Sequence, residues 1–576
     1  MGAVAAMTWT LIGALLVYTT CAIDSSPTEV GTFDELSRAL MDAISYTSIV
    51  IKASSEIISF PKQLEISSGR HVSIASATWC SRTPCCFKSL SESAAVVRAA
   101  ASTPSSVLIR PVLSGRGENR LFVLTNSSLE LRGCLLSSGR CLACDGGAIF
   151  VGIGSSLVMH AVEISACQAS DGGAVYAEAE SSITLVNCNL TSNVASRGGA
   201  VYAAEYSALD ATGCTISANF AEDSGGGVFS SGAAVILDAV AVGLTSSGGV
   251  FAHRSTITTE PHKCSMASNV AAFGGAMHAT DDSIITMTNC EMLGNSAYNG
   301  GAIMVHEGAS ISFAKCELSS NTAIHDGGAV LVLGATAHFM NCVMVSNSAQ
   351  FHGGAVASFP GSVVNFTDSY LALNVANNGG AQYMFGHSAL DVRNCDIEYN
   401  VAQFGGVVSL SDHSVVQIAH SRLSFNVANG DGGGGGVVGV FDHSVVRLSN
   451  CTLNSNSAKF GGVVCAYGES SIFATDCTLF GNSAIRGGAV HMQDEDCDSE
   501  MERCMLDSNY ASSGGAFSAS GYATFSASYC TFASNTASGG GAIYAGGVMH
   551  RRMLLRNQAN VSLPPLPLSL RSLAWP

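Results

Sequence analysis

Two segments of this 576-residue chain carry the same run of an aspartate, a histidine and a serine. Stacked carboxylates and imidazoles can serve as acid and base in glycoside chemistry. Asp412, His413, Asp442 and His443 are therefore the candidate catalytic residues of a carbohydrate-active enzyme, namely a polysaccharide lyase, hydrolase or epimerase. A solvated turn carries the same residue types, and no basic residue of the kind that a lyase uses lies near them in the sequence. We therefore expect no catalysis and keep the enzyme as the alternative.

Other acidic residues take equivalent places in the chain and could bind a cation. Carboxylate oxygens are ligands for Ca²⁺, so calcium is the one cofactor that the pattern leaves open. The candidate ligands are Asp281, Asp282, Glu307, Asp494 and Asp496. The last two lie in an acidic loop that lacks the regular ligand spacing and the glycine turn of a dedicated calcium loop.

Two histidines, His325 and His352, precede glycine pairs in successive repeats. The repeat predicts that their rings stack, which is the geometry of a weak metal site. Two imidazoles alone make a poor one, since zinc sites use three or four protein ligands.

All of these residues sit on a repeat of about 26 residues that is marked by glycine pairs. Helical repeats need about 33 to 47 residues, whereas a repeat of about 20 to 29 holds only short strands and turns. In one repeat, residues 174–176, 183–185 and 188–190 are three brief segments with period-2 alternation. The sequence thus predicts an all-β fold, a single-stranded right-handed parallel β-helix solenoid with about 16 or more coils of about 26 residues. The second glycines are Gly147, Gly173, Gly199, Gly227, Gly249, Gly275, Gly301, Gly328, Gly354, Gly380, Gly406, Gly436, Gly462, Gly488, Gly515 and Gly541.

Identical residues one coil apart stack about 4.8 Å from each other, so repeated letters become columns. One column holds cysteines, which we interpret as buried, reduced, small hydrophobes, with some cross-links as the alternative. A second column holds asparagines, which tolerate left-handed backbone geometry in turns and pass amide hydrogen bonds from coil to coil. Both columns are interpreted as architecture. They include Cys188, Cys214, Cys290, Cys316, Asn193, Asn295, Asn321 and Asn347, with Ser369 and Ser421 in two cysteine positions.

The termini indicate export and a capped solenoid. Residues 1–22 are apolar and end in small residues, which predicts a secretory signal peptide, with an uncleaved anchor as the alternative. No other stretch is long and apolar enough to span a membrane. Residues 23–140 are expected to hold a short capping helix near Phe33, the first coils and a cysteine-containing insertion, residues 141–545 the regular repeats, and residues 546–576 a disordered tail.

The cysteines of the insertion and of the coil that follows could pin a loop by disulfides, with zinc binding as the alternative. These cysteines are Cys80, Cys85, Cys86, Cys134, Cys141 and Cys144. An exported protein also exposes N-x-S/T sequons to glycosylation. The sequons lie at Asn126, Asn189, Asn365, Asn450 and Asn560.

The charge and composition of the chain limit the classes of partner that it is expected to bind. Only 12% of the residues are charged, about half of the usual share of about 25%, and the formal net charge is −17. Because the chain has no extended Lys/Arg cluster, we expect no nucleic-acid partner.

The repeat string itself resembles a known family. Residues 188–201 and 530–543 read as a cysteine, an asparagine five residues later, and a Gly-Gly-Ala-[Val/Ile] end. This string resembles the GGA[ILV] and FxxN repeats of the polymorphic outer membrane protein family of autotransporter adhesins. The resemblance covers about residues 140–545, although the FxxN half is strictly met only at Phe532. No run of alternating β segments follows Ile543, so the family's C-terminal membrane barrel is not expected in this chain.

The resemblance implies a secreted or cell-surface protein with a pectin-lyase-like β-helix. Its expected function is that of a non-enzymatic scaffold or adhesin that contacts glycans or surface proteins along one flank, without a membrane span after signal removal.

Overall fold

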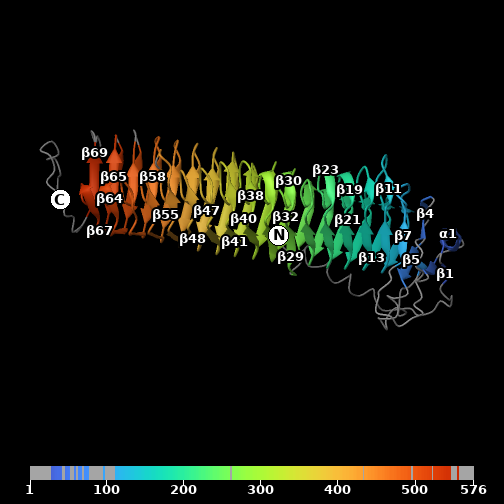
Figure 1. Ribbon diagram of the computed structural model, residues 1–576. Coiled ribbons are helices and arrows are strands. Elements are labelled where there is room, and N and C mark those ends of the chain that lie inside the picture. Colours follow the sequence, from blue (N-terminus) through green and yellow to red (C-terminus); the bar gives the residue numbers. More distant parts are fainter. Residues whose placement is uncertain are drawn as a thin grey trace, which may run out of the picture. The chain divides into compact units, whose positions relative to one another are not determined.

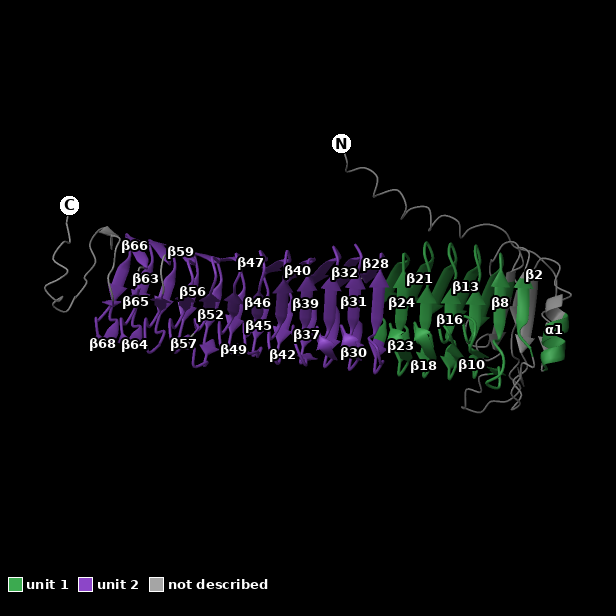
Figure 2. Cartoon of the chain, turned by 90° about the horizontal axis from the view of Figure 1, so that it is seen from above, with its two compact units in different colours: residues 1–241 green, residues 242–576 purple. Residues whose placement is uncertain are grey.

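The computed structural model describes residues 28–30, 32–41, 46–51, 58–59, 62–67, 71–76, 95–97, 111–259, 262–432, 434–493, 497–521, 523–546 and 554–556. The chain divides into two compact units, residues 1–241 and residues 242–576 (Figure 2). Some sequence predictions fall outside the described residues. They concern the signal peptide, Cys80, Cys85, Cys86, Asp494, Asp496, Asn560 and all of the tail except Gly546, which ends β69 (Ile543–Gly546), and β70 (Leu554–Arg556).

The first unit is built from coils of short parallel strands (Figure 1). Each strand pairs with its counterpart in the next coil, and Val175, for example, is the partner of Val201. Inward and outward side chains alternate, so that Ile183 and Leu185 are buried in the core while Thr184 between them is partly exposed. One coil contains β16 (Val175–Ala177), β17 (Ser182–Val186), β18 (Asn189–Thr191) and β19 (Val194–Arg197), and the next contains β20 (Val201–Ala203), β21 (Ala208–Thr212), β22 (Thr215–Ser217) and β23 (Phe220–Ser224).

The second unit repeats the same coil. Its strands also pair in parallel, for example Val408 with Val438 and Val415 with Val445. Three successive coils contain β46 (Gln382–Met384), β47 (Ala389–Arg393), β48 (Asp396–Glu398), β49 (Val401–Ala402), β50 (Val408–Leu410), β51 (Val415–Ala419), β52 (Arg422–Ser424), β53 (Val427–Ala428), β54 (Val438–Val440), β55 (Val445–Ser449), β56 (Thr452–Asn454) and β57 (Ser457–Ala458). The chain thus forms an all-β, right-handed parallel β-solenoid of about 16 turns with about 26 residues each, which confirms the predicted fold class.

The two glycines of a pair are required for different reasons. Gly327 has a φ of 68°, a left-handed conformation that glycine adopts without steric cost. At Gly328 the limit is space, because a Cβ would collide with the carbonyl oxygen of Gly354 in the next coil. The glycine register that marks the repeat therefore follows from one turn conformation and one close approach of two backbones.

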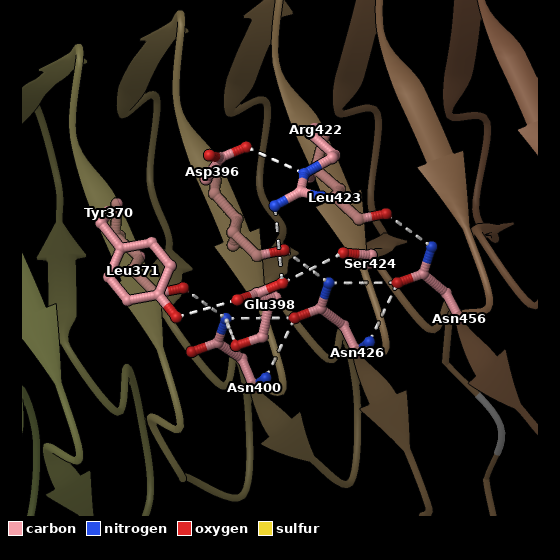
Figure 3. Close-up of polar contacts among 11 residues, drawn as sticks. Tyr370, Leu371, Asp396, Glu398, Asn400, Arg422, Leu423, Ser424, Asn426 and Asn456 are labelled. Carbon is pink, nitrogen blue, oxygen red and sulfur yellow. Dashed lines mark hydrogen bonds and ion pairs between the residues drawn. The ribbon is translucent and has the colours of Figure 1, made fainter.

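Asparagines of successive coils form a hydrogen-bond ladder inside the solenoid, which Figure 3 shows for Asn400, Asn426 and Asn456. The side-chain nitrogen of Asn400 donates to Oδ1 of Asn426 at 3.1 Å and to the carbonyl oxygen of Leu371 at 3.0 Å. The backbone N–H of Asn400 donates to the same Oδ1 at 3.0 Å. Asn400 and Asn426 are fully buried, so the ladder satisfies polar groups that would otherwise be costly to bury.

The expected left-handed geometry at these asparagines was wrong. Positive φ falls on the residue before each ladder asparagine, for example Tyr399 at 58° and Phe425 at 58°. The physical reason is orientation, because the left-handed residue turns the chain and thereby aims the next side chain into the core.

The cysteine column is also a set of buried hydrogen-bonding groups. The backbone N–H of Cys290 donates to Sγ of Cys316 at 3.5 Å, and the thiol of Cys316 donates to the carbonyl oxygen of Ala314 at 3.4 Å. A serine does the same at position 421, where its hydroxyl accepts from the N–H of Cys395 at 3.1 Å. This shared role explains why serine replaces cysteine in the column.

A short helix, α1 (Phe33–Met41), lies beside β1 (Thr28–Val30) and β2 (Tyr46–Ile51). Its first turn is a capping box, in which the Glu35 N–H donates to Oγ1 of Thr32 at 3.2 Å and the Thr32 N–H donates to a Glu35 carboxylate oxygen at 3.1 Å. Phe33 and Leu36 are buried. The predicted helix is therefore present, and it is short. No helix in the described part of the chain has the length and apolar character to cross a membrane.

The remaining cysteine and sequon residues are placed as follows. Cys141 and Cys144 form a disulfide, and Cys134 is buried in the core. Asn126 and Asn450 are exposed, as a glycosylated asparagine requires. Asn189 and Asn365 lie partly buried in β18 and in β44 (Val363–Thr367).

Candidate functional site

The Asp-His residues lie in the tight turns that join two strands of a coil. Asp412 and His413 connect β50 to β51 and have consecutive positive φ values of 55° and 59°. Asp442 and His443 connect β54 to β55 with values of 50° and 55°. Two successive left-handed residues are the pattern of a type I′ turn, which favours Asn, Asp and Gly. The turn therefore explains the aspartates, and would accept glycine or asparagine where the chain has histidine.

The preceding coil has the same turn with Gly386 and His387, at φ values of 70° and 56°. The backbone N–H of His387 donates to the carbonyl oxygen of Asp412 at 2.9 Å, and that of His413 donates to Asp442 at 3.0 Å. The turns are thus held in register by the same kind of coil-to-coil hydrogen bond as the strands.

This register stacks three imidazoles into what we call the histidine column, His387, His413 and His443. The ring centroids of His387 and His413 are 5.0 Å apart, and those of His413 and His443 are 4.9 Å apart. About half of the side-chain surface of His413 (51%) and of His443 (47%) is open to solvent. The column is therefore an ordered and accessible set of imidazoles.

Carboxylates contact two of the three imidazoles of the histidine column. Oδ1 of Asp412 lies 3.2 Å from Nδ1 of His413, and a carboxylate oxygen of Glu469 lies 3.3 Å from Nδ1 of His443. His387, Asp412 and His413 each offer one ligand atom, and these atoms lie within 4.8 Å of one another. Within the described ranges no other three His, Cys, Asp or Glu side chains come together in this way.

The candidate calcium ligands are arranged differently. The Thr280 hydroxyl lies 2.8 Å from Oδ2 of Asp281 and 3.0 Å from a Glu307 carboxylate oxygen. His253 Nδ1 lies 2.8 Å from the same Oδ2 of Asp281. The hydrogen bond from Thr280, followed by the bond from His253, holds the pKa of the Asp281 carboxyl below its ordinary value. Asp282 is exposed to solvent, and among the described residues these carboxylates belong to no group of three or more His, Cys, Asp or Glu side chains with their ligand atoms within 4.8 Å.

The predicted stack of His325 on His352 was wrong, because the two residues occupy different register positions. His352 pairs with Asp326, which directly precedes the glycine pair of its own coil. Asp326 instead lies between the two rings, with His325 Nδ1 2.7 Å from Oδ2 and His352 Nδ1 2.7 Å from Oδ1. The side chain of Asp326 is only 9% exposed, so this is a compact carboxylate clamp on two imidazoles.

A further pair of histidines could not be recognised from spacing alone. His278 in β31 (Met277–Thr280) and His306 in β35 (Ile303–His306) face each other with their Nε2 atoms 2.8 Å apart. Phe251 packs edge-on against the His278 ring at 4.9 Å between centroids. Burial, assisted by the neighbouring His306, lowers the pKa of His278 to about 3. This imidazole is therefore neutral at physiological pH.

Exposed apolar side chains gather on the short fourth strand of successive coils in the second unit. This surface, which we call the apolar flank, was not predicted. The strands that carry it pair in register, with Val270 beside Ser296, Ser296 beside Thr322 and Thr322 beside Ser348. Its members are between 38% and 57% exposed, whereas the adjacent ladder is fully buried. The apolar flank consists of Val270, Phe273, Tyr298, Ile324, Phe351 and Val375, on or next to β30 (Val270–Phe273), β34 (Ser296–Asn299), β38 (Thr322–Ala323) and β42 (Ser348–Ala349).

A signal for this flank does exist in the sequence. Its members follow a ladder asparagine by one, three or four residues, where a solvated turn would carry polar side chains. Large apolar residues recur at those offsets in neighbouring coils, and Ser296, Thr322 and Ser348 lie between Val270 and Val375 in the register.

Residues 529–546 match the model of the Chlamydia polymorphic membrane protein repeat. The matched segment contains β67 (Thr531–Ala533), β68 (Thr536–Gly539) and β69 (Ile543–Gly546), so it spans most of one coil of the solenoid. No curated protein matches the chain with significance. By this repeat, and by the parallel β-solenoid that the repeat builds, the chain is similar to the polymorphic membrane proteins of Chlamydia.

Proposed function

We propose that this chain is a secreted or cell-surface scaffold without enzymatic activity, which binds glycans or surface proteins along one side of its second unit. The observation that carries the proposal is the apolar flank. Soluble proteins rarely expose contiguous apolar surface without a binding role. Here six large apolar side chains from neighbouring coils are between 38% and 57% exposed, and Tyr298 and Ile324 lie one coil apart.

The architecture supports a display role. The inward residues stabilise the fold by packing and by the asparagine and cysteine hydrogen bonds. The outward residues of each coil are therefore available to contact a partner. Because those positions repeat with the coil, a partner meets a regular array of side chains about 4.8 Å apart. The match to a polymorphic membrane protein repeat supports the cell surface as the place of action.

The test is binding of the full chain to cell monolayers and to a glycan array. Replacing Tyr298, Ile324 and Phe351 by serine removes the centre of the apolar flank and should lower binding at least tenfold, because the exposed apolar area provides the contact. Met340 is 49% exposed but lies outside the flank, so Met340→Ser is a matched control and should bind like the parent. Unchanged binding by the folded triple variant would contradict the proposal. Protease treatment of the cells then separates protein partners from glycan partners.

A carbohydrate-active enzyme is the second candidate. The observation in its favour is the contact of an imidazole with a carboxylate at Asp412 and His413, 3.2 Å apart. Incubation of the chain with plant, algal and bacterial polysaccharides, followed by assays for reducing ends and unsaturated uronates, tests this function. We expect no product. Product that disappears when Asp412, His413, Asp442 and His443 are replaced by alanine would establish the enzyme instead.

A further inference from the structure

We propose that His387, Asp412 and His413 form a binding site for a divalent transition-metal ion, with Zn²⁺ as the ion that best fits the ligands. The site goes beyond the proposed binding role and does not depend on it, since the apolar flank and the histidine column share no residue.

The ligand set fits this chemistry. Imidazole nitrogen and carboxylate oxygen are ordinary Zn²⁺ ligands, at about 2.0 to 2.2 Å from the ion. Three such ligands around one ion lie about 3 to 4 Å apart, and the three ligand atoms here already lie within 4.8 Å of one another. His387 and His413 are exposed and Asp412 is partly exposed, so small side-chain rotations close the remaining gap. Three protein ligands leave at least one coordination position for water or a further ligand.

The backbone presents these side chains in a fixed arrangement. His387 and Asp412 are joined by the hydrogen bond from the His387 N–H to the Asp412 carbonyl oxygen, at 2.9 Å. The turn that contains His387 is tied down by Ser388, whose hydroxyl donates to the carbonyl oxygens of Phe385 at 2.7 Å and Phe359 at 3.0 Å. The site therefore lies on adjacent coils of a regular solenoid. Because its backbone is already held by hydrogen bonds, metal binding needs to order little of it.

The left-handed turn position tolerates histidine without requiring it, since Gly, Asn, Asp and His all occur at positive φ and the chain uses Gly361 and Asp282 in other coils. Histidine instead occupies the equivalent place in three successive coils and stacks at 5.0 and 4.9 Å. Stacked imidazoles beside a carboxylate bring three Zn²⁺ ligand groups to one place.

The other histidine clusters of the second unit lack this combination. Asp326 already holds Nδ1 of both His325 and His352 at 2.7 Å. His278 and His306 face each other, and no carboxylate completes a set of three within the described residues. Zn²⁺ bound at these other clusters would be present in the parent and in the variants alike. The test therefore compares the number of Zn²⁺ equivalents bound by the parent with the number bound by each variant.

The first experiment measures bound Zn²⁺ on the full chain, stripped with a chelator and dialysed against Zn²⁺. The parent should hold one equivalent more than the His387→Gln, Asp412→Asn, His413→Gln triple variant. His420 is an exposed histidine in a left-handed turn outside the cluster, so His420→Gln should match the parent. His443→Gln should also match it, because His443 is not among the three ligands. Equal stoichiometry in parent and triple variant, or loss of the equivalent in His443→Gln, would overturn the assignment.

The second experiment needs no variant and is therefore independent of folding defects. Histidine modification by diethyl pyrocarbonate, located by mass spectrometry, is compared with and without Zn²⁺ on the parent chain. Zn²⁺ should protect His387 and His413 several-fold relative to His420. Equal modification of these histidines in both conditions would overturn the site even if every variant unfolds. Failure of cell or glycan binding would leave both results unaffected, so the two proposals are separable.

Discussion

Oδ1 of Asn347 accepts two hydrogen bonds from Asn321 in the preceding coil, one from its backbone N–H and one from its side-chain nitrogen, both at 3.0 Å. The side-chain nitrogen of Asn321 also donates to the carbonyl oxygen of Met292 at 2.9 Å. Each ladder asparagine thus forms hydrogen bonds with groups of the preceding coil and of the following coil. Its removal therefore leaves buried polar groups without a partner in both neighbouring coils.

Replacement of Asn321 by leucine should destabilise the protein by at least about 1 to 3 kcal/mol, because Asn295 and Met292 each lose a buried hydrogen-bond partner. Urea unfolding followed by circular dichroism measures the change. Asn429 is exposed, so the control Asn429→Leu should stay within about 0.5 kcal/mol of the parent. A silent Asn321→Leu would show that the ladder adds no stability.

Replacement of the second glycine of a pair by alanine should lower the stability of the protein more than replacement of a left-handed glycine that has no neighbouring atoms around it. In Gly328→Ala the new Cβ collides with the Gly354 carbonyl oxygen, and two coils must separate. Gly361 has a φ of 75°, and a Cβ added there would meet no atom within 4 Å, so Gly361→Ala costs only the backbone strain of a left-handed residue, about 1 to 2 kcal/mol. Thermal unfolding should show a clearly larger loss for Gly328→Ala, and the reverse order would refute the close-approach explanation.

Burial raises the pKa of the Cys395 thiol to about 11 from an ordinary value near 9. Its contribution to stability is therefore complete below pH 9 and is lost as the pH rises from 9 to 11, where the unfolded thiol ionises more readily. Iodoacetamide at pH 8 should leave Cys395 unmodified in the native chain and label it after denaturation, as read by mass spectrometry. Rapid native labelling would contradict a buried thiol.

His278 should make the protein sensitive to acid. Its pKa in the folded chain is about 3 and its ordinary value is 6.5, so the stability that it contributes is present above pH 6.5 and is lost as the pH falls toward 3. Each unit of such a difference is worth about 1.4 kcal/mol.

The variant His278→Met copies Met304, the next residue of the same column, and should unfold at a lower pH than the parent. His420→Gln again serves as the control, because His420 is exposed. Identical acid unfolding of His278→Met and the parent would show that this imidazole does not govern the transition.

Much of the fold follows from local constraints that are visible in the sequence as repeated residues. Gly327 and Gly328 mark a corner because only glycine fits there, and Asn321 recurs because a buried amide needs an identical partner one coil away. A repeat of about 26 residues leaves room only for short strands, so the parallel solenoid and its inward columns were predictable. The capping helix was predictable as well, since Phe33 and Leu36 are spaced for one buried face.

Parts of the candidate sites could be predicted from the sequence and parts could not. The one-residue difference in register between His325 and His352 decides whether the rings stack or share Asp326. The sequence contains this difference, because His325 lies two residues before its glycine pair and His352 lies one residue before its own. The left-handed conformation of Tyr399, rather than of Asn400, became visible only in the folded backbone.

The sequence by itself determined the coil, its period and the residues that face inward, because each coil repeats the same local constraints of glycine geometry and buried hydrogen bonding. Only the tertiary structure decided which outward residues of different coils meet. His387 lies 26 residues from His413, and Tyr298 lies 26 residues from Ile324, and the folded coils bring the first pair into ring contact and the second pair to neighbouring positions on the surface. Contacts between coils depend on exact register and on side-chain direction, and these are properties of the assembled solenoid.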